Sequence, residues 1–170
     1  VHFGDSFTPI SQVLDNMGPG DILTHCFTGR QNNILDPEGR LLPAVRAAAK
    51  RGVRFDVGHG MGSFGFATAR AALEQGLIPT TISSDLHSYS AAYPVVDLLT
   101  TMSKFVHLGM SLSDVVARTT SAPAAVLGQA GHIGTLQPGG EADVAVVREL
   151  EGEFKLWDCY KNAETATRLL

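Results

Sequence analysis

The chain has 170 residues and a formal net charge of −4, with 44% hydrophobic and 18% charged residues. This length and apolar content suit one compact domain or a piece of a larger one, and the negative charge argues against nucleic acid or an anionic membrane as a partner. No apolar run approaches the ~20 residues of a membrane span, no signal peptide is recognisable, and the two cysteines do not form a disulfide framework, so we expect a cytoplasmic protein.

The first residues, VHFGDSF, have the character of a β-strand that is ending. They contain neither an initiating methionine nor a capped helix start. We therefore expect that residues upstream of Val1 are missing from this chain, and that His2 stands at the end of a strand.

Three later stretches repeat one pattern of helix, glycine, strand and polar residue. They are VLDNMGPGDILTHCF (13–27), AAAKRGVRFDVGHG (47–60) and AALEQGLIPTTISSDLH (71–87). The glycines stand where a helix C-terminus favours a residue with positive φ. The strands are short and apolar on both faces, which is typical of a parallel sheet covered by helices. The pattern predicts an α/β fold with right-handed crossovers.

Four consecutive strands of this fold end on a side chain that can bind metal or transfer protons. These side chains are His2, His25, His59 and Asp85. Ligands of α/β folds bind at the carboxyl ends of the strands, whether the sheet is open or closed into a barrel. The four residues are therefore the first candidates for a functional site.

The rest of the chain does not continue this alternation of helix and strand. Helices are expected over LSDVVARTT (112–120), where Ser111 and Asp114 form a capping box, and over APAAVLG (122–128). Glycine-rich turns follow, then the alternating ADVAVV (142–147) and EFKLWDCYKN (153–162), which predict two strands. We expect an α/β part over residues 1–130 and part of a small β module over residues 131–170.

Each candidate also has an ordinary structural explanation. A histidine at a strand end is often only a hydrogen-bonded residue, but His25 lies in THCF without a charged neighbour, a setting that suits a neutral imidazole bound to metal. Asp85 ends an apolar strand, where an ionised carboxylate is costly unless it is paired with a cation. The alternative for Asp85 is an Asx turn or the cap of the next helix.

The remaining polar residues give weaker signals. His59 lies in GHGMGSFG, whose glycines allow a ligand to approach the backbone, although the spacing is not a phosphate-binding signature. His87 follows Asp85 by two residues and could equally face solvent. Cys26 should point away from His25, because side chains alternate along a strand. Arg30 is the only arginine in a site loop, and a surface role is favoured for it.

Taken in order, these segments resemble the amidohydrolase superfamily, and most closely its dihydroorotase-like amidohydrolase and deacetylase group. The resemblance runs from VLDNMGPGDILTHCF through DVGHG, ISSDLHSYS and DLLTTMSKF to GGEADVAVV, and so covers nearly the whole chain. It implies the C-terminal half of a (β/α)8 barrel, strands five to eight, followed by part of a small β-sandwich domain.

The resemblance also implies roles for the candidates. His2 and His25 would be the metal ligands on strands five and six, and Asp85 on strand eight would bind a second ion and act as general base. His59 would contact the substrate and polarise its carbonyl, with His87 as a further substrate contact. The family's first-strand His-x-His pair and carboxylated lysine have no counterpart here, so the binuclear site would be incomplete in this chain.

The function implied is a metal-dependent hydrolase that cleaves an amide or ester bond of a small molecule. Imidazole and carboxylate ligands suit Zn²⁺, with Mn²⁺ or Fe²⁺ as alternatives. Expected partners are a small-molecule substrate and the N-terminal half of the same barrel, and a homo-oligomer is left open. The rival interpretations are a non-catalytic α/β domain that binds a small ligand, and an inactive remnant that has lost its metal.

Overall fold

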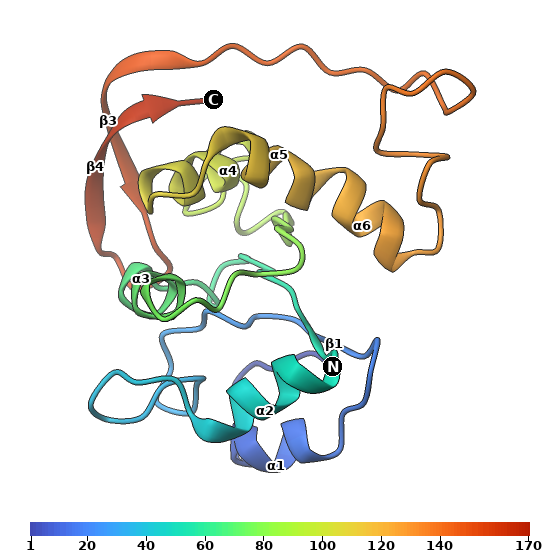
Figure 1. Cartoon of the computed structure of the whole chain (residues 1–170). Helices are drawn as coiled ribbons and strands as arrows, with labels where there is room; N and C mark the ends of the chain where they lie inside the picture. The colour runs from blue at the N-terminus through green and yellow to red at the C-terminus, as the bar shows by residue number, and fades with distance from the viewer.

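A computed structural model describes all residues from 1 to 170 and contains six α-helices and four β-strands (Figure 1). In chain order the elements are α1 (Ile10–Asp15), β1 (Ile22–Leu23), α2 (Pro43–Arg51), β2 (Arg54–Phe55), α3 (Phe66–Glu74), α4 (Leu98–His107), α5 (Leu112–Thr119), α6 (Ser121–Val126), β3 (Leu150–Trp157) and β4 (Ala163–Leu169). None of the helices combines the length and the apolar character needed to cross a membrane.

The N-terminal two thirds hold four extended segments that pair in parallel and in sequence order. β1 pairs with β2, and one isolated bridge on each side adds the segment around His2 and the segment around Thr81. The paired residues are His2 with Thr24, Ile22 with Arg54, Leu23 with Phe55, and Asp56 with Thr81. The alternation of helix and parallel strand that the sequence predicts is therefore confirmed.

The predicted helix ends are also confirmed where glycine is required. Gly52 follows α2 with φ of 92°, and Gly76 lies just beyond α3 with φ of 84°. A residue with a Cβ is disfavoured in this left-handed conformation, and glycine is not. At the other end of a helix, the Ser111 side chain accepts a hydrogen bond from the Asp114 amide and begins α5, as the capping box predicts.

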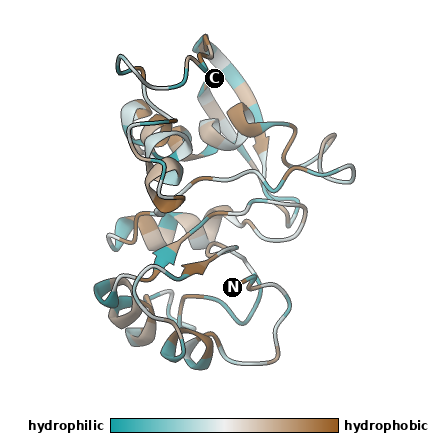
Figure 2. Cartoon of the chain, turned by 90° about the vertical axis from the view of Figure 1, so that its right-hand side faces the viewer, coloured by the Kyte–Doolittle hydropathy of each residue, from teal (hydrophilic) through white to brown (hydrophobic).

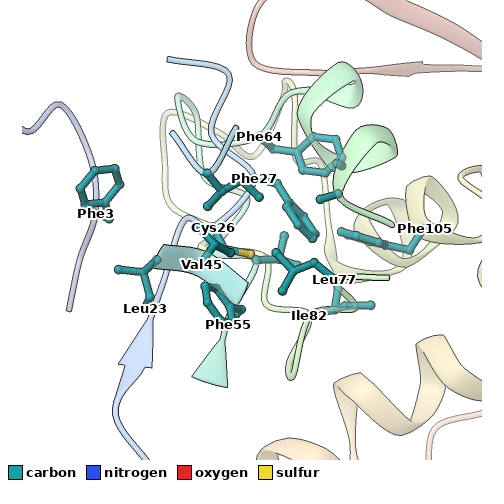
Figure 3. Close-up of a cluster of buried hydrophobic side chains, with 14 of the residues drawn as sticks. Phe3, Leu23, Cys26, Phe27, Val45, Phe55, Phe64, Leu77, Ile82 and Phe105 are labelled. Carbon is teal, nitrogen blue, oxygen red and sulfur yellow. The ribbon is translucent and has the colours of Figure 1, made fainter. Parts of the chain in front are cut away.

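The core lies between the parallel segments and the helices that cover them (Figure 3). Three phenylalanines meet there: the ring centroid of Phe105 lies 6.1 Å from that of Phe27 and 5.7 Å from that of Phe64. Cys26 is buried in the same cluster. His25 before it has φ of 67° and lies beyond the end of β1, so strand alternation does not apply at this position. Such aromatic packing contributes both burial of apolar area and favourable ring geometry, at about 1 kcal/mol per pair for the latter.

The two strands of the C-terminal hairpin cover other residues than the sequence predicts. β3 and β4 pair antiparallel, but ADVAVV (142–147) forms no strand and runs as an exposed extended segment from α6 toward β3 (Figure 1). Val146 is 96% exposed. The expectation of a strand at 142–147 is wrong for this structure, because an alternating segment becomes a strand only when a partner strand pairs with it.

The hairpin is attached to the α/β part and does not stand apart from it. β4 packs on α4, and Leu156 and Ala166 are buried in the same core cluster as the phenylalanines. When the molecule is turned by 90° and coloured by hydropathy, the hairpin and helices of the upper part lie above β1 and β2 (Figure 2). The division into residues 1–130 and 131–170 stays a prediction.

Candidate metal and catalytic site

Two imidazoles lie side by side at the ends of neighbouring parallel segments. His2 pairs with Thr24, the residue just before His25, and the ring centroids of His2 and His25 are 4.4 Å apart with an interplanar angle of 66°. His2 is exposed, and His25 is only 5% exposed. The parallel register therefore brings together two side chains that are 23 positions apart in the sequence.

A hydrogen bond fixes the orientation of the buried imidazole. His25 Nδ1 lies 2.5 Å from the carbonyl oxygen of Gly58, on the next parallel segment. Because a carbonyl only accepts hydrogen bonds, Nδ1 carries the proton, and Nε2 of the neutral ring keeps a free lone pair. Metal-bound histidines have this arrangement, in which one ring nitrogen donates to the protein and the other faces the metal.

Asp85 stands at the end of the fourth extended segment. Its backbone has φ of 46°, which is uncommon for a residue other than glycine, and its side chain is exposed. The carboxylate makes no hydrogen bond within the chain, so the structure shows neither an Asx turn nor a helix cap at this position. Its oxygens remain available for a cation or a proton.

The turn Gly58–His59–Gly60 packs against two of the candidate residues, His25 and Asp85. Gly58 has φ of 49° and Gly60 has φ of 53°, and a Cβ at either position would approach its neighbours more closely than the 3.0 Å that real Cβ atoms keep. The atoms in the way are a ring nitrogen of His25 and Thr24 Oγ1 at Gly58, and a carboxylate oxygen of Asp85 at Gly60. The two glycines allow His25 and Asp85 to rest directly on this backbone.

His59 itself is fully buried, and its imidazole points into the interior. Its ring stacks on Phe64 with centroids 4.6 Å apart, and its Nε2 lies 2.7 Å from Lys104 Nζ on α4. Burial, and then the charge of Lys104, lower the pKa of His59 to about 3. The ring is therefore neutral near pH 7, and its contact with a substrate stays a prediction.

His87 lies on the loop after Asp85 and is exposed. Its Nδ1 accepts a hydrogen bond of 3.3 Å from the Tyr89 amide, and the two rings meet edge to face. No hydrogen bond joins it to Asp85. Its proposed role as a substrate contact rests on its position in this loop.

Asp56, on the segment that follows β2, is a polar residue that the sequence analysis did not single out. Its carboxylate accepts hydrogen bonds from three hydroxyls on the flanking segments: Thr24 at 2.6 Å, Thr81 at 2.6 Å and Ser83 at 2.8 Å. One side chain thus ties together the segments that carry His25, His59 and Asp85. A carboxylate between the apolar residues Phe55 and Val57 was the available signal.

The chain does not bring together a complete set of metal ligands. No group of three or more His, Cys, Asp and Glu side chains comes close enough to hold one ion. His2 and His25 fit two positions of a site, in side-chain type and in the tautomer that the Gly58 carbonyl imposes. Structural and catalytic zinc sites use three or four protein ligands, so this pair would need partners from elsewhere.

A cavity of about 650 Å³ lies near His2, which is close to its lining residue Gly4, but neither His2 nor His25 lines it. It is lined by Gly4, Asp5, Ser6, Phe7, Arg30, Gln31 and Asn32, which belong to the loops that follow His2 and His25. Arg30 forms an ion pair with Asp5, with 3.1 Å between Nε and Oδ1. The cavity is polar and of a size that suits a small molecule.

Comparison with known proteins gives one family and several relatives. The model of the amidohydrolase family matches residues 10–164. A deacetylase of Brucella anthropi is 35% identical over 169 residues, which make up 99% of this chain and 42% of that protein. The chain therefore spans less than half the length of this curated relative.

Solved structures agree in fold over almost the whole chain. A crystal structure of an adenine deaminase superposes with a TM-score of 0.93 at 33% identity, over 98% of this chain and 45% of that one. A dihydroorotase structure gives a TM-score of 0.86 at 36% identity, over 99% of this chain and 44% of that one. Both matches again leave more than half of the larger chain without a counterpart.

Proposed function

The chain belongs to the amidohydrolase family, and on that premise we propose that it forms strands five to eight of a (β/α)8 barrel in a metal-dependent hydrolase. The barrel half would be completed by the part of the protein that this chain does not include, which would also supply the remaining metal ligands. The four parallel segments in sequence order support this assignment.

The observation that carries the proposal is the His2–His25 pair. Two imidazoles meet at the same end of the sheet, and one of them has its Nδ1 proton committed to a backbone carbonyl. Imidazole and carboxylate donors suit Zn²⁺ first, and Mn²⁺ or Fe²⁺ as alternatives. The same end carries Asp85, whose carboxylate has no partner in the chain.

A divalent ion bound at these residues would lower the pKa of a coordinated water and polarise the carbonyl of the substrate. His2 and His25 would hold this ion, and the Gly58 carbonyl keeps His25 in the tautomer whose Nε2 is free to bind it. Asp85 is the proton carrier: it accepts the proton of the attacking water and returns it to the leaving amine or alkoxide.

The bond that is cleaved is an amide or an ester of a small molecule. The Brucella anthropi relative is named a deacetylase, which favours removal of an acyl group. The adenine deaminase and dihydroorotase structures are named for other reactions. The proposal therefore includes both an amine and an alkoxide as the leaving group. The polar cavity beside His2 would admit the substrate.

An Asp85→Asn substitution in the full-length protein tests the catalytic assignment. Asparagine keeps the size of the side chain but cannot accept the proton, so kcat for an acyl ester or amide should fall by ~10² or more. The matched control is Asp15→Asn, which changes an exposed carboxylate at the end of α1 that makes no hydrogen bond. Equal loss in both variants, or activity of Asp85→Asn within a few-fold of wild type, would remove Asp85 from the mechanism.

A further inference from the structure

Lys104 on α4 is a fully buried lysine without a carboxylate partner. Its Nζ lies 2.7 Å from His59 Nε2 and 2.8 Å from the carbonyl oxygen of Pro94, and it faces the Phe64 ring at 5.8 Å from the centroid. Lysine is almost never fully buried unless it is paired with an opposite charge. An ammonium group in this position is removed from water, and its two hydrogen-bond acceptors, His59 Nε2 and the Pro94 carbonyl, carry no negative charge.

The charge states of the pair follow from this burial. The pKa of Lys104 is lowered to about 8, mainly by burial, and the pKa of His59 is lowered to about 3. Near pH 7 the lysine is therefore the charged partner and the imidazole is neutral. The Lys104 ammonium has three N–H donors and no acceptor, so His59 Nε2 has to accept.

The contact with Lys104 and the contact with the Gly60 carbonyl fix the same tautomer of His59. With Nε2 as the acceptor, Nδ1 carries the hydrogen and donates to the Gly60 carbonyl at 2.9 Å. The Cys159 thiol from the C-terminal hairpin donates to the same carbonyl at 3.5 Å. In the other tautomer, Nδ1 and the Gly60 oxygen would both be acceptors and would repel each other.

The Gly60 carbonyl belongs to the turn that supports the site. Gly58 of this turn accepts the hydrogen bond of His25, and the Gly60 amide donates to Ser84, the residue before Asp85. We propose that Lys104 is a positioning residue of the active site, which acts through His59 by locking the imidazole tautomer that holds the Gly58–Gly60 turn under His25 and Asp85. The proposal rests on the hydrolase function proposed above.

Stability alone does not account for the pair. Replacing a buried charged group and its partner by apolar side chains of similar volume is often neutral or stabilising. Methionine at position 104 and phenylalanine at position 59 would fill this space and could stack on Phe64. A lysine placed here therefore points to a requirement for the hydrogen bond that it donates.

The test compares Lys104→Met with wild type in the full-length, metal-loaded protein. The kcat for an acyl ester or amide should fall about ten- to hundredfold while KM and metal content change less than about twofold, because a shift of an ångström at the catalytic groups costs rate. ¹⁵N shifts of histidine-labelled protein should show His59 protonated at Nδ1 in wild type and at Nε2, or at both, in the variant. Lys155→Met, which changes an exposed lysine of β3, is the matched control and should match wild type.

A double variant, His59→Phe with Lys104→Met, guards against misfolding of the single variant. It should fold and should lose kcat by the same factor as Lys104→Met, since both residues act through one contact. An unchanged kcat in either variant, or an unchanged His59 tautomer in Lys104→Met, would overturn the proposal. If wild type hydrolyses no acyl ester or amide, the hydrolase proposal fails, and the tautomer measurement still decides whether Lys104 orients His59.

Discussion

Individual residues of the site are held by backbone atoms of one short turn. His25 donates to the Gly58 carbonyl, and a carboxylate oxygen of Asp85 lies less than 3.0 Å from the position that a Cβ of Gly60 would take. The precision of the site therefore depends on two glycines with positive φ and on the buried residues that fix the turn. Lys104 and His59 provide that fixation from inside the molecule.

The buried lysine makes stability depend on pH in a defined window. The Lys104 pKa is about 8 in the folded chain and 10.5 ordinarily, so between these values the unfolded chain binds more protons and stability rises with pH. The ionisable groups that face this ammonium are Cys159, Asp158 and His59. Between pH 7 and pH 9 His59 is neutral, and burial raises the pKa of Cys159 from 9.0. From pH 7 to pH 9, wild type should gain about 1 kcal/mol relative to Lys104→Met.

Urea denaturation of the two proteins at pH 7 and pH 9 measures this difference. If the free energy of unfolding changed equally in both proteins, the lysine would be already neutral at pH 7 or solvated in the folded state. His59 does not affect this comparison. Its pKa is lowered from 6.5 to about 3, so the protein loses the stability that depends on neutral His59 only as the pH falls from 6.5 toward 3.

Residue-level prediction from sequence succeeds where the strand pattern places a polar side chain at a strand end. It places His2 beside His25, because parallel strands in sequence order bring their carboxyl ends to one edge, and it places Asp85 at the end of the fourth segment. The roles of the three residues stay predictions. It does not find Lys104, since a lysine within a helix is normally exposed and only the tertiary contacts bury it. It also misses Asp56, whose role depends on hydroxyls from segments 25 and more positions away.

At the level of elements, the turn between β3 and β4 fastens the C-terminal hairpin to the site loops. The Tyr160 hydroxyl accepts from the Gly29 amide at 2.9 Å and donates to the Gly62 carbonyl at 2.9 Å. Gly29 follows the loop of His25, and Gly62 follows the turn of His59. A Cβ at Gly29 would collide with the Tyr160 ring, so the close approach requires glycine.

Removing this hydroxyl should loosen the loops without disturbing the strands. Tyr160→Phe leaves the Gly29 amide without a partner, and we expect a loss of about 1–2 kcal/mol of local stability. Amide hydrogen exchange at Gly29 should then become about tenfold faster, while exchange at Leu23 and Phe55 stays the same. Tyr89→Phe is the control, because the Tyr89 side chain is exposed and its hydroxyl makes no hydrogen bond. Equal exchange at Gly29 in all three proteins would contradict the role of Tyr160.

Element boundaries follow from the sequence where a local signal exists. The glycines after α2 and α3 and the Ser111 cap of α5 are such signals, and the structure confirms them. The strand expected at 142–147 fails and β4 was not foreseen, since the pairing of a strand depends on its partner and not on its own alternation. The hairpin forms because β4 supplies that partner to β3 within the chain.

At the scale of the molecule, the chain spans less than half the length of the relatives that it matches. It spans 42% of the Brucella anthropi deacetylase and 45% of the adenine deaminase. These matches include 99% and 98% of this chain. The exposed valines of segment 142–147 and the two-ligand histidine pair are features that the remainder of a barrel and of a β-sandwich would complete. The family resemblance drawn from the order of the motifs is confirmed, and the assignment to strands five to eight of a barrel stays a proposal.

We propose that His2 and His25 bind a divalent ion in the whole protein, and metal analysis of the full-length protein is the most direct test. Wild type, His25→Ala and the control His132→Ala, which changes an exposed histidine outside the site, are purified in the presence of Zn²⁺, dialysed and analysed for metal per folded chain. We expect bound metal in wild type and His132→Ala and a clear loss in His25→Ala. Equal metal content in wild type and His25→Ala, or no retained metal in wild type, would contradict the account.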